Sequence, residues 1–282
     1  MGEYTSSQPS SERRLSVIAR LRKAIERGEL GLHYQPTVDL HTGEIEGVEA
    51  LARWKDEELG TVTPSEFIPL AEETGLIEPL GAWVMDEVAS QAREWEAQGM
   101  RFDIAFNLSP RQLRQPELLD GMRTTLAAAG VPFERFVIEI TESSVLPDFE
   151  STVALLRTVS AQGFRIAIED FGVELSLSRL LELPVDILKI DRSFVSALST
   201  APNAAVMVQM IIQLADKLGV RAHAEGVETE AEHRFLLANG CSHGQGYLFS
   251  KPVPAGAIRQ LYLESIYSRV LPVHADHTRG LV

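Results

Sequence analysis

The chain has 282 residues, 45% of them hydrophobic, which is enough for one domain with a sizeable core. Its formal net charge of −14 argues against nucleic acid polymers and anionic membranes as partners, because such a surface repels both. The chain has a single cysteine, Cys241, so no intramolecular disulfide is possible. No apolar stretch approaches the roughly 20 residues of a membrane span, and the polar first residues do not resemble a signal peptide. These features favour a cytoplasmic protein.

The N-terminal part is predicted to form a helix and then a hairpin. Apolar residues recur at helical spacing from Leu15 to Ile25, which indicates an amphipathic helix. Residues 32–40 and 44–54 have the character of strands. The link of residues 41–43 between them is short enough for an antiparallel pair.

Two helices are expected next. Thr63 followed by Pro64 is typical of a capped helix start, which predicts a helix over residues 63–75. A longer amphipathic helix is predicted over residues 76–99.

From there the chain repeats a rhythm of strand, loop and helix, with helices expected from about Pro110 and over residues 148–161. Connections of this length make every strand pairing except the first parallel. About eight strands in this order predict an α/β fold, a modified TIM-like (β/α)8 barrel with one antiparallel strand. The barrel is placed at residues 15–269, between a flexible leader (1–14) and a polar tail (270–282).

Polar residues stand at the far ends of the strand-like runs. In a β/α barrel these ends meet at one rim, where active sites are built. Any one of them alone is more simply explained as a helix cap or an ion-pair partner. Asn107 could form a turn into the next helix, and Lys189 could pair with Asp191. One shared site explains the whole set better than separate structural roles: Glu49, Asn107, Glu139, Glu169, Asp170, Lys189 and Glu225.

The oxygen donors in this set suit a hard cation, Mg²⁺ or Mn²⁺, and a pair of such ions would serve phosphodiester cleavage. Lys189 is a candidate to orient water or to neutralise charge on phosphate. Glu225 is the candidate base, because it follows a different strand from the carboxylates assigned to metal.

Several segments resemble, in order, the blocks of the EAL family of bacterial cyclic-di-GMP phosphodiesterases. The signature is Glu49-Ala50-Leu51, and the resemblance extends from about Ile18 to Leu263. The other blocks are YQPTVDLHTGEIEG, FIPLAEETGLIEPLG, FNLSPRQL, IEITES, LPVDILKIDRSFV, AEGVETE and GCSHGQGYLFSKP.

The resemblance implies a modified barrel with one antiparallel strand and metal-dependent hydrolysis of cyclic-di-GMP to linear pGpG. It also implies dimerisation beside the loop that follows the fifth strand. By position it assigns metal ligation to Glu49, Asn107, Glu139, Glu169 and Asp170; catalysis to Glu49, Lys189 and Glu225; substrate contacts to Gln35, Leu51, Arg53 and Gln245; and anchoring of that loop to Glu142.

The chain departs from the family pattern mainly in that loop. Where the family has Asp-Asp-Phe-Gly-Thr-Gly-Tyr-Ser-Ser, this chain has Glu169-Asp170-Phe171-Gly172-Val173-Glu174-Leu175-Ser176, which is one residue short. Asp56 and Glu57 replace a His-Pro step. Because Mg²⁺ demands near-ideal geometry, a lengthened ligand at 169 predicts weakened hydrolysis. The alternative is a degenerate domain that acts as a cyclic-di-GMP receptor or an interaction module with a signalling protein as partner.

Overall fold

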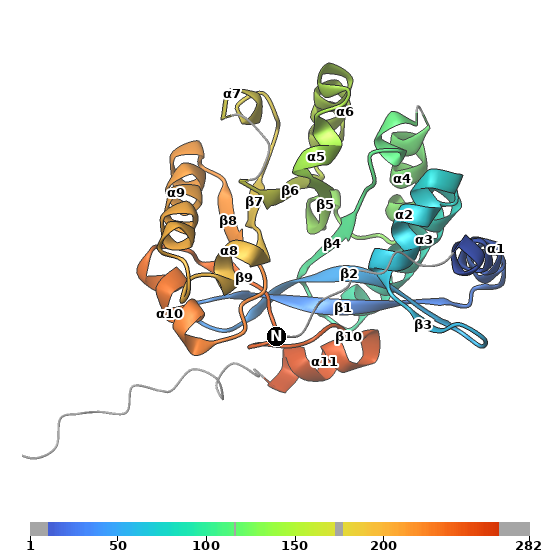
Figure 1. The fold of residues 1–282 in the computed structure, drawn as a ribbon, viewed down its shortest axis with the longest axis horizontal. Coiled ribbons are helices and arrows are strands. Elements are labelled where there is room, and N and C mark those ends of the chain that lie inside the picture. Colours follow the sequence, from blue (N-terminus) through green and yellow to red (C-terminus); the bar gives the residue numbers. More distant parts are fainter. Residues whose placement is uncertain (1–10, 116, 173–176, 265–282) are drawn as a thin grey trace, which may run out of the picture.

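The computed structural model describes residues 11–115, 117–172 and 177–264 (Figure 1). Its strands are β1 (Leu30–Asp39), β2 (Ile45–Asp56), β3 (Gly60–Val62), β4 (Asp103–Asn107), β5 (Phe136–Thr141), β6 (Arg165–Phe171), β7 (Ile187–Ile190), β8 (Arg221–Ala224), β9 (His243–Gly244) and β10 (Val253–Pro254). Its α-helices are α1 (Ser11–Arg27), α2 (Pro64–Thr74), α3 (Ile77–Ala97), α4 (Leu118–Ala127), α5 (Glu142–Val145), α6 (Phe149–Ala161), α7 (Leu177–Leu180), α8 (Arg192–Ser196), α9 (Pro202–Leu218), α10 (Glu230–Ala238) and α11 (Ala255–Glu264). None of these helices is long and apolar enough to cross a membrane.

Eight of these strands close into a barrel, which confirms the predicted fold class. The sheet runs β10-β1-β9-β8-β7-β6-β5-β4-β2-β3, and an additional pairing of β1 with β2 completes the ring. From β2 through β4 to β9 the neighbouring barrel strands are parallel. Strand β1 is antiparallel to β2 and to β9.

The expectation that only the first pairing is antiparallel was therefore wrong. A single reversed strand has two neighbours in a closed barrel, so β1 makes two antiparallel pairings within the ring. The short strands β3 and β10 add two more, to β2 and β1 respectively. Strand β3 has three residues and β10 has two, so neither is long enough to show the alternation of apolar and polar residues that predicts a strand.

The hairpin that reverses β1 is fixed by its turn. Asp39 Oδ1 accepts the backbone N–H groups of His41 and Thr42, each at 2.8 Å, and Gly43 adopts a φ of 75°. A short acidic side chain and a left-handed glycine are the usual chemistry of such a turn. The strands then pair from Leu30 opposite Trp54 to Val38 opposite Ile45.

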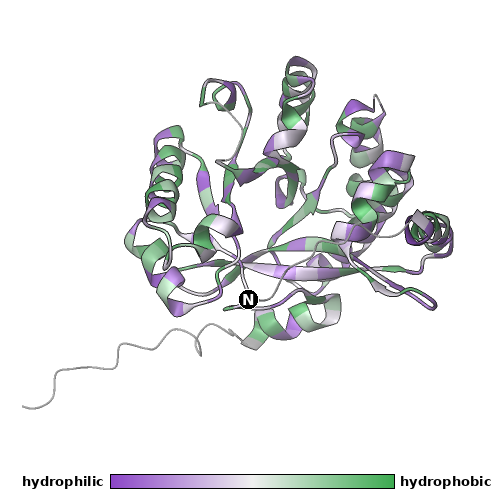
Figure 2. Cartoon of the chain, viewed as in Figure 1, coloured by the Kyte–Doolittle hydropathy of each residue, from purple (hydrophilic) through white to green (hydrophobic). Residues whose placement is uncertain are grey.

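The alternation of side chains along each strand separates two of the three hydrophobic clusters in the described residues. Large apolar residues such as Ile138 and Ile168 are buried in the core that includes the outer helices. Ala105, Val137, Ala167 and Ile187 form a separate small cluster from four adjacent barrel strands. Figure 2 shows hydrophobic and hydrophilic residues alternating around the outer helices, as expected when one helical face packs on a sheet.

This interior cluster explains how the site residues are aimed. Because side chains alternate with a period of two, residues two positions further along β5, β6 and β7 share the inward face. Those residues are Glu139, Glu169 and Lys189. The period of the strands therefore stacks the polar set directly above a small apolar layer.

Two helices begin at places that differ from the predictions. Helix α1 starts at Ser11 rather than Leu15, and Leu15 is 68% exposed while Val17 and Leu21 are fully buried. The helix expected from Pro110 is replaced by a 3-10 turn over Gln112–Arg114, and α4 starts only at Leu118. Residues 1–10 of the predicted leader and the tail at 270–282 lie outside the described residues.

The unusual Asp56 anchors α1 to the β2–β3 turn. Its carboxylate is 2.7 Å from Arg20 Nε and accepts the backbone N–H groups of Glu58 and Leu59 at 2.8 Å. The departure at this position thus has a structural role.

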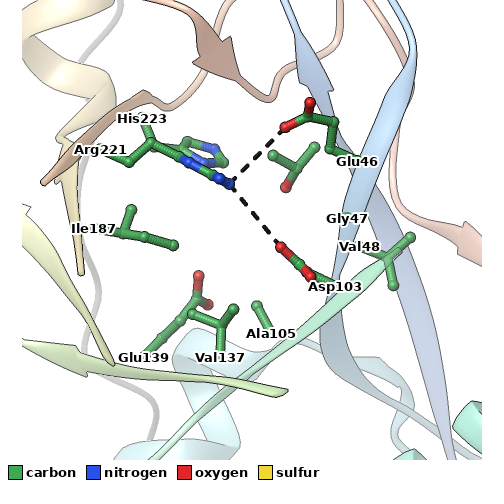
Figure 3. A pocket seen from close by; sticks show the side chains of 11 residues that line it. Glu46, Gly47, Val48, Asp103, Ala105, Val137, Glu139, Ile187, Arg221 and His223 are labelled. Carbon is green, nitrogen blue, oxygen red and sulfur yellow. Dashed lines mark ion pairs between the residues drawn. The ribbon is translucent and has the colours of Figure 1, made fainter. Parts of the chain in front are cut away.

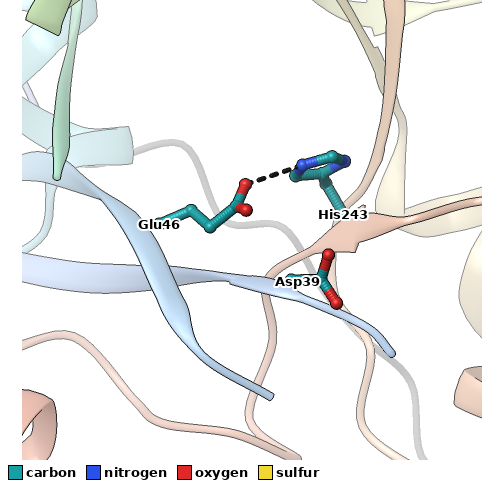
Figure 4. A group of neighbouring side chains, drawn as sticks. All are labelled: Asp39, Glu46 and His243. Atoms are coloured by element: carbon teal, nitrogen blue, oxygen red, sulfur yellow. Dashed lines mark ion pairs between the residues drawn. The ribbon is translucent and has the colours of Figure 1, made fainter. Parts of the chain in front are cut away.

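The end of the barrel opposite the polar rim is closed by ionic contacts between β1, β2 and β9. His243 Nε2 lies 2.7 Å from Glu46 Oε2, and Asp39 lies beside them (Figure 4). Asp103 of β4 pairs there with Arg165 of β6. The first contact joins β2 to β9 across β1, where the ring closes, and the second joins β4 to β6 across β5.

Candidate active site

The ammonium group of Lys189 is the centre of the polar set. Lys189 is 1% exposed, and its Nζ lies 2.6 Å from Glu139, 2.7 Å from Glu169, 2.7 Å from Glu225 and 3.6 Å from Glu49. These glutamates come from β2, β5, β6 and the residue after β8. The barrel therefore brings together five of the residues that the sequence grouped at one rim.

Asn107 and Asp170, the other two predicted members, lie beside this cluster. Asn107 Nδ2 donates to Glu49 Oε1 at 3.2 Å, which leaves its amide oxygen available as a ligand. Asp170 has a φ of 54°, unusual for a residue other than glycine, at an irregularity in the β6–β7 register. Such backbone strain is typical of functional positions.

The local pairing of Lys189 with Asp191 was wrong. Asp191 instead caps α8 by accepting the backbone N–H of Ser193 at 2.9 Å. It also lies next to Asp170 and Glu225, where it could hold a cation. The sequence contained a signal for this role, because Asp191 directly follows β7 at the same rim as the other residues.

Burial and crowding perturb the protonation of the cluster. Burial raises the pKa of Glu139 well above its usual range, and burial followed by neighbouring carboxylates raises that of Glu225 to about 7. The pKa of Asp170 rises to about 6 through burial and its hydrogen bond with Asp191. Burial lowers the pKa of Lys189, but the surrounding glutamates outweigh it and hold the ammonium charged.

The residues present fit divalent cations. Glu49, Glu169 and Glu225 each offer an oxygen within 4.8 Å of the others, and so do Asp170, Asp191 and Glu225. Glu225 belongs to both groups, and every donor is an oxygen, as Mg²⁺ and Mn²⁺ prefer. Two adjacent groups with a shared carboxylate are suited to a two-ion site.

The position of Glu225 differs from the one on which its predicted role as a base was argued. It was expected to act as a base because it stood apart from the metal-binding carboxylates, yet its carboxylate is the member common to both groups. Tertiary closure brings the end of β8 next to β6, which spacing along the chain does not show.

Gln245 and Gln35 support the cluster from the β1 side. Gln245 Nε2 donates to Glu49 Oε2 at 2.6 Å, and Gln35, level with Glu49 in the hairpin, donates to the carbonyl of Ser250 at 3.1 Å. A Cβ on Gly246 would lie 2.1 Å from the carbonyl oxygen of Val227. Only glycine therefore allows the chain to pass so close and to hold Gln245 in place.

A groove of about 700 Å³ leads to the cluster between the rim and helices α2 and α3. It is lined by Leu51, Ile68, Leu80, Asn107 and Asp170, among others. A mainly apolar groove of this size with polar groups at one end is typical of a site for a small molecule. The predicted substrate residue Leu51 lines this groove.

All the predicted substrate contacts, and the loop contact of Glu142, remain predictions. Arg53 is half-buried, and its Nη1 donates to the carbonyl of Ala52 at 2.9 Å. Glu142 is buried as the first residue of α5, but residues 173–176 of the loop that it was expected to anchor lie outside the described residues.

Comparison with known proteins agrees with this geometry. The EAL domain family matches residues 18–252. The chain belongs to the EAL domain family. The match covers the barrel and every residue of the candidate site.

Named relatives have the same domain. The bifunctional diguanylate cyclase/cyclic di-GMP phosphodiesterase MucR of Pseudomonas aeruginosa is 40% identical over 253 residues, covering 89% of this chain and 37% of that protein. The cyclic di-GMP phosphodiesterase PdeR of Escherichia coli K12 is 35% identical over 266 residues, covering 93% and 40%. The chain therefore spans about two fifths of the length of these relatives.

A solved EAL structure superposes on most of the barrel. The PaMucR phosphodiesterase in complex with c-di-GMP matches with a TM-score of 0.83 and 41% identity, covering 86% of this chain and 99% of that one.

The raised pKa of Glu225 predicts an unusual pH dependence of stability in this EAL domain. Its usual value is 4.5 and its value in the fold is about 7, so between these values the folded state binds more protons than the unfolded state. The free energy of unfolding of metal-free protein should therefore fall as pH rises from 5 to 8, by on the order of 3 kcal/mol from this group. Urea unfolding in EDTA at pH 5 and at pH 8 measures this free energy. A free energy of unfolding that rises towards pH 8 would contradict the prediction, and saturating Mg²⁺ should remove most of the fall.

Proposed function

We propose that this EAL domain hydrolyses cyclic-di-GMP to linear pGpG with Mg²⁺ or Mn²⁺, most simply as a pair of ions. The observation that carries the proposal is the pair of carboxylate groups that share Glu225 at the end of a 700 Å³ groove. MucR and PdeR, which bear the same domain, are named as cyclic di-GMP phosphodiesterases. The groove is large enough for part of a dinucleotide, and its polar end is where a phosphate would lie.

A phosphate diester is an anion, and the rim is already rich in carboxylates, so charge must be compensated before it can bind. Divalent cations, when bound, supply that charge, activate water and stabilise the leaving oxygen. Glu49, Asn107, Glu139, Glu169, Asp170, Asp191 and Glu225 are the residues placed to hold them.

The remaining side chains of the site orient the carboxylates and position the substrate. Lys189 holds the glutamates in one arrangement through contacts of 2.6–2.7 Å with three of them. Gln245 donates to Oε2 of Glu49 and Asn107 to Oε1, so that neither oxygen of Glu49 turns freely. Leu51, which lines the groove, would contact a base, and Arg53 would contact a phosphate oxygen.

We expect weakened turnover, because Glu169 is longer by one methylene than the aspartate of the family pattern. Its Oε1 reaches Lys189 at 2.7 Å, so the longer arm is committed to the ammonium. The alternative function is a degenerate receptor that binds cyclic-di-GMP and acts through a signalling protein. The same substitution and the short loop favour it.

Chromatography of cyclic-di-GMP incubated with the protein and with Mg²⁺ or Mn²⁺ tests the proposal, with Glu49→Ala as the blank. Formation of pGpG that the blank lacks supports hydrolysis, and faster turnover with Mn²⁺ supports a distorted site. No product above the blank rejects hydrolysis. Binding of cyclic-di-GMP in calorimetry then supports the receptor, and an absence of binding rejects it too.

We also propose a homodimer through α7 and α9. Leu177 and Leu181 are 59% and 68% exposed one helical turn apart, and Val206 and Met210 of α9 are 53% and 57% exposed with the same spacing. Four of the seven large exposed hydrophobic residues in the described part of the chain are thus on α7, at the residue that follows it, and on α9. Large apolar side chains that a monomer leaves exposed are candidates for burial in an interface.

Substitution Met210→Arg is expected to convert a dimer to a monomer, because it places a charge in the apolar face. Light scattering after gel filtration measures the mass, and Leu15→Arg, on the exposed face of α1, is the matched control. A monomeric parent protein, or a Met210→Arg variant that remains dimeric, would contradict this interface.

A further inference from the structure

A small cavity lies inside the barrel, near the glutamate cluster. Its volume is about 30 Å³, and its lining includes Glu139, His223, Arg221, Glu46 and Thr37. Figure 3 shows the carboxylate of Glu139, from β5, and the ring of His223, from β8, pointing towards the same space. The cavity therefore connects a residue of the candidate site to a histidine with no role in the chemistry proposed above.

Two polar atoms on this cavity lack a partner. In residues 11–115, 117–172 and 177–264, three buried side-chain polar atoms have no hydrogen-bond partner, and two of them are Glu139 Oε2 and His223 Nε2. Both residues are at least 95% buried. Folded proteins rarely leave such atoms unpaired, because desolvation without a compensating hydrogen bond is costly. That two of the three border one cavity indicates a common partner.

Water is the partner that fits. A buried water needs about 10–15 Å³ and two to four polar neighbours, so this cavity holds one or two. The guanidinium of Arg221 and the apolar side chains of Val48, Val137 and Ile187 form other parts of the wall. The carboxylates of Glu46 and Asp103 also line the cavity, and Arg221 Nη1 lies 3.9 Å and 4.0 Å from them, so their charge is already compensated by the protein.

We propose that one or two buried waters bridge His223 Nε2 to Glu139 Oε2, and that His223 is a positioning residue for Glu139. Lys189 Nζ holds Glu139 Oε1 at 2.6 Å, and the water holds the other oxygen. With both oxygens fixed, the carboxylate keeps one rotamer as cations bind. The hydration site stands on these contacts alone, and only its effect on turnover rests on the proposed function.

The competing interpretation is that His223 only fills space. In that case, replacing it by an apolar residue removes an unpaired buried nitrogen, which offsets the loss of the ring's hydrogen bond with Gln245, and leaves the protein as stable or more stable. If the water bridge is present, the same change leaves Glu139 Oε2 without its partner. The two interpretations thus predict opposite signs.

Three variants separate these interpretations: His223→Val, which removes the hydrogen bond in a side chain suited to a strand; His223→Gln, which retains one; and His41→Val, in the exposed hairpin turn, as control. We expect His223→Val to lower the melting temperature without metal and to weaken Mn²⁺ binding in calorimetry by about 10–100-fold, as loss of a supporting hydrogen bond does at metal sites. His223→Gln should recover most of both effects, and His41→Val should match the parent. Equal or higher stability of His223→Val with unchanged Mn²⁺ affinity would overturn the proposal.

A high-resolution crystal structure of the unaltered protein is the second test. Density for water within hydrogen-bond distance of both atoms supports the bridge, and a dry cavity overturns it. If the parent protein proves unable to hydrolyse cyclic-di-GMP, the proposed function fails, yet stability, Mn²⁺ binding and density still decide the hydration site. In an active protein, His223→Val should lower kcat more than it changes KM for cyclic-di-GMP.

Discussion

Substitution Lys189→Met is expected to reduce hydrolysis of cyclic-di-GMP by about 10²–10³-fold, the range found when a single buried electrostatic donor is removed from an active site. It should also lower the free energy of unfolding of the metal-free protein at pH 8 by roughly 3–5 kcal/mol. The reason for both is that Lys189, which is 1% exposed, compensates four glutamates, three of them at 2.6–2.7 Å. Removing the ammonium leaves those carboxylates crowded together.

Product chromatography and urea unfolding measure the two effects, with Lys217→Met as the control because Lys217 is 82% exposed. Saturating Mg²⁺ should recover part of the lost stability, since a cation takes over the compensation of charge. A Lys189→Met variant with parental stability in EDTA would show that the glutamates are already protonated and that Lys189 is not the source of their order.

Substitution Glu225→Gln is expected to reduce hydrolysis by about 10²–10⁴-fold, the range for loss of an essential acid–base group, because this carboxylate belongs to both cation-binding groups. Its effect on stability should have the opposite sign to that of Lys189→Met. The carboxyl has a pKa of about 7, so at pH 8 the fold bears the cost of its charge, and a neutral amide removes that cost.

The metal-free Glu225→Gln variant should therefore be at least as stable as the parent at pH 8, with a flatter dependence of stability on pH. Unfolding at pH 5 and 8 and Mn²⁺ calorimetry measure this, with the exposed turn residue changed by Glu44→Gln as control. Retained Mn²⁺ affinity in Glu225→Gln would contradict the shared-ligand geometry and return Glu225 to the role of a base outside the cation groups.

Opposite effects on stability from two variants that both lose activity would identify an electrostatic site. A purely structural cluster would lose stability in both cases. The comparison separates charge compensation by Lys189 from the cost of accommodating Glu225, and it needs no ligand.

The sequence by itself grouped seven residues that the structure brings to one rim, and it determined which way most of them face. Polar residues at the ends of apolar runs, together with a period of two along each strand, placed Glu139, Glu169 and Lys189 on one face before any coordinates. The short link after Asp39 determined the reversal of β1, and the blocks around Glu49 determined the family. All of these are local signals, readable within about ten residues.

Tertiary structure alone decided which of these residues touch. Three of these relations depend on strands that are far apart in the chain. Lys189 contacts four glutamates, and Glu225 is shared between two carboxylate groups, one of which includes Asp191. His223 and Glu139 border one cavity. These relations are set by the register between neighbouring strands and by the closure of β1 on β2 and β9. Register is a property of pairs of strands, and closure is a property of the whole ring, so neither is encoded in the spacing of residues along a single segment.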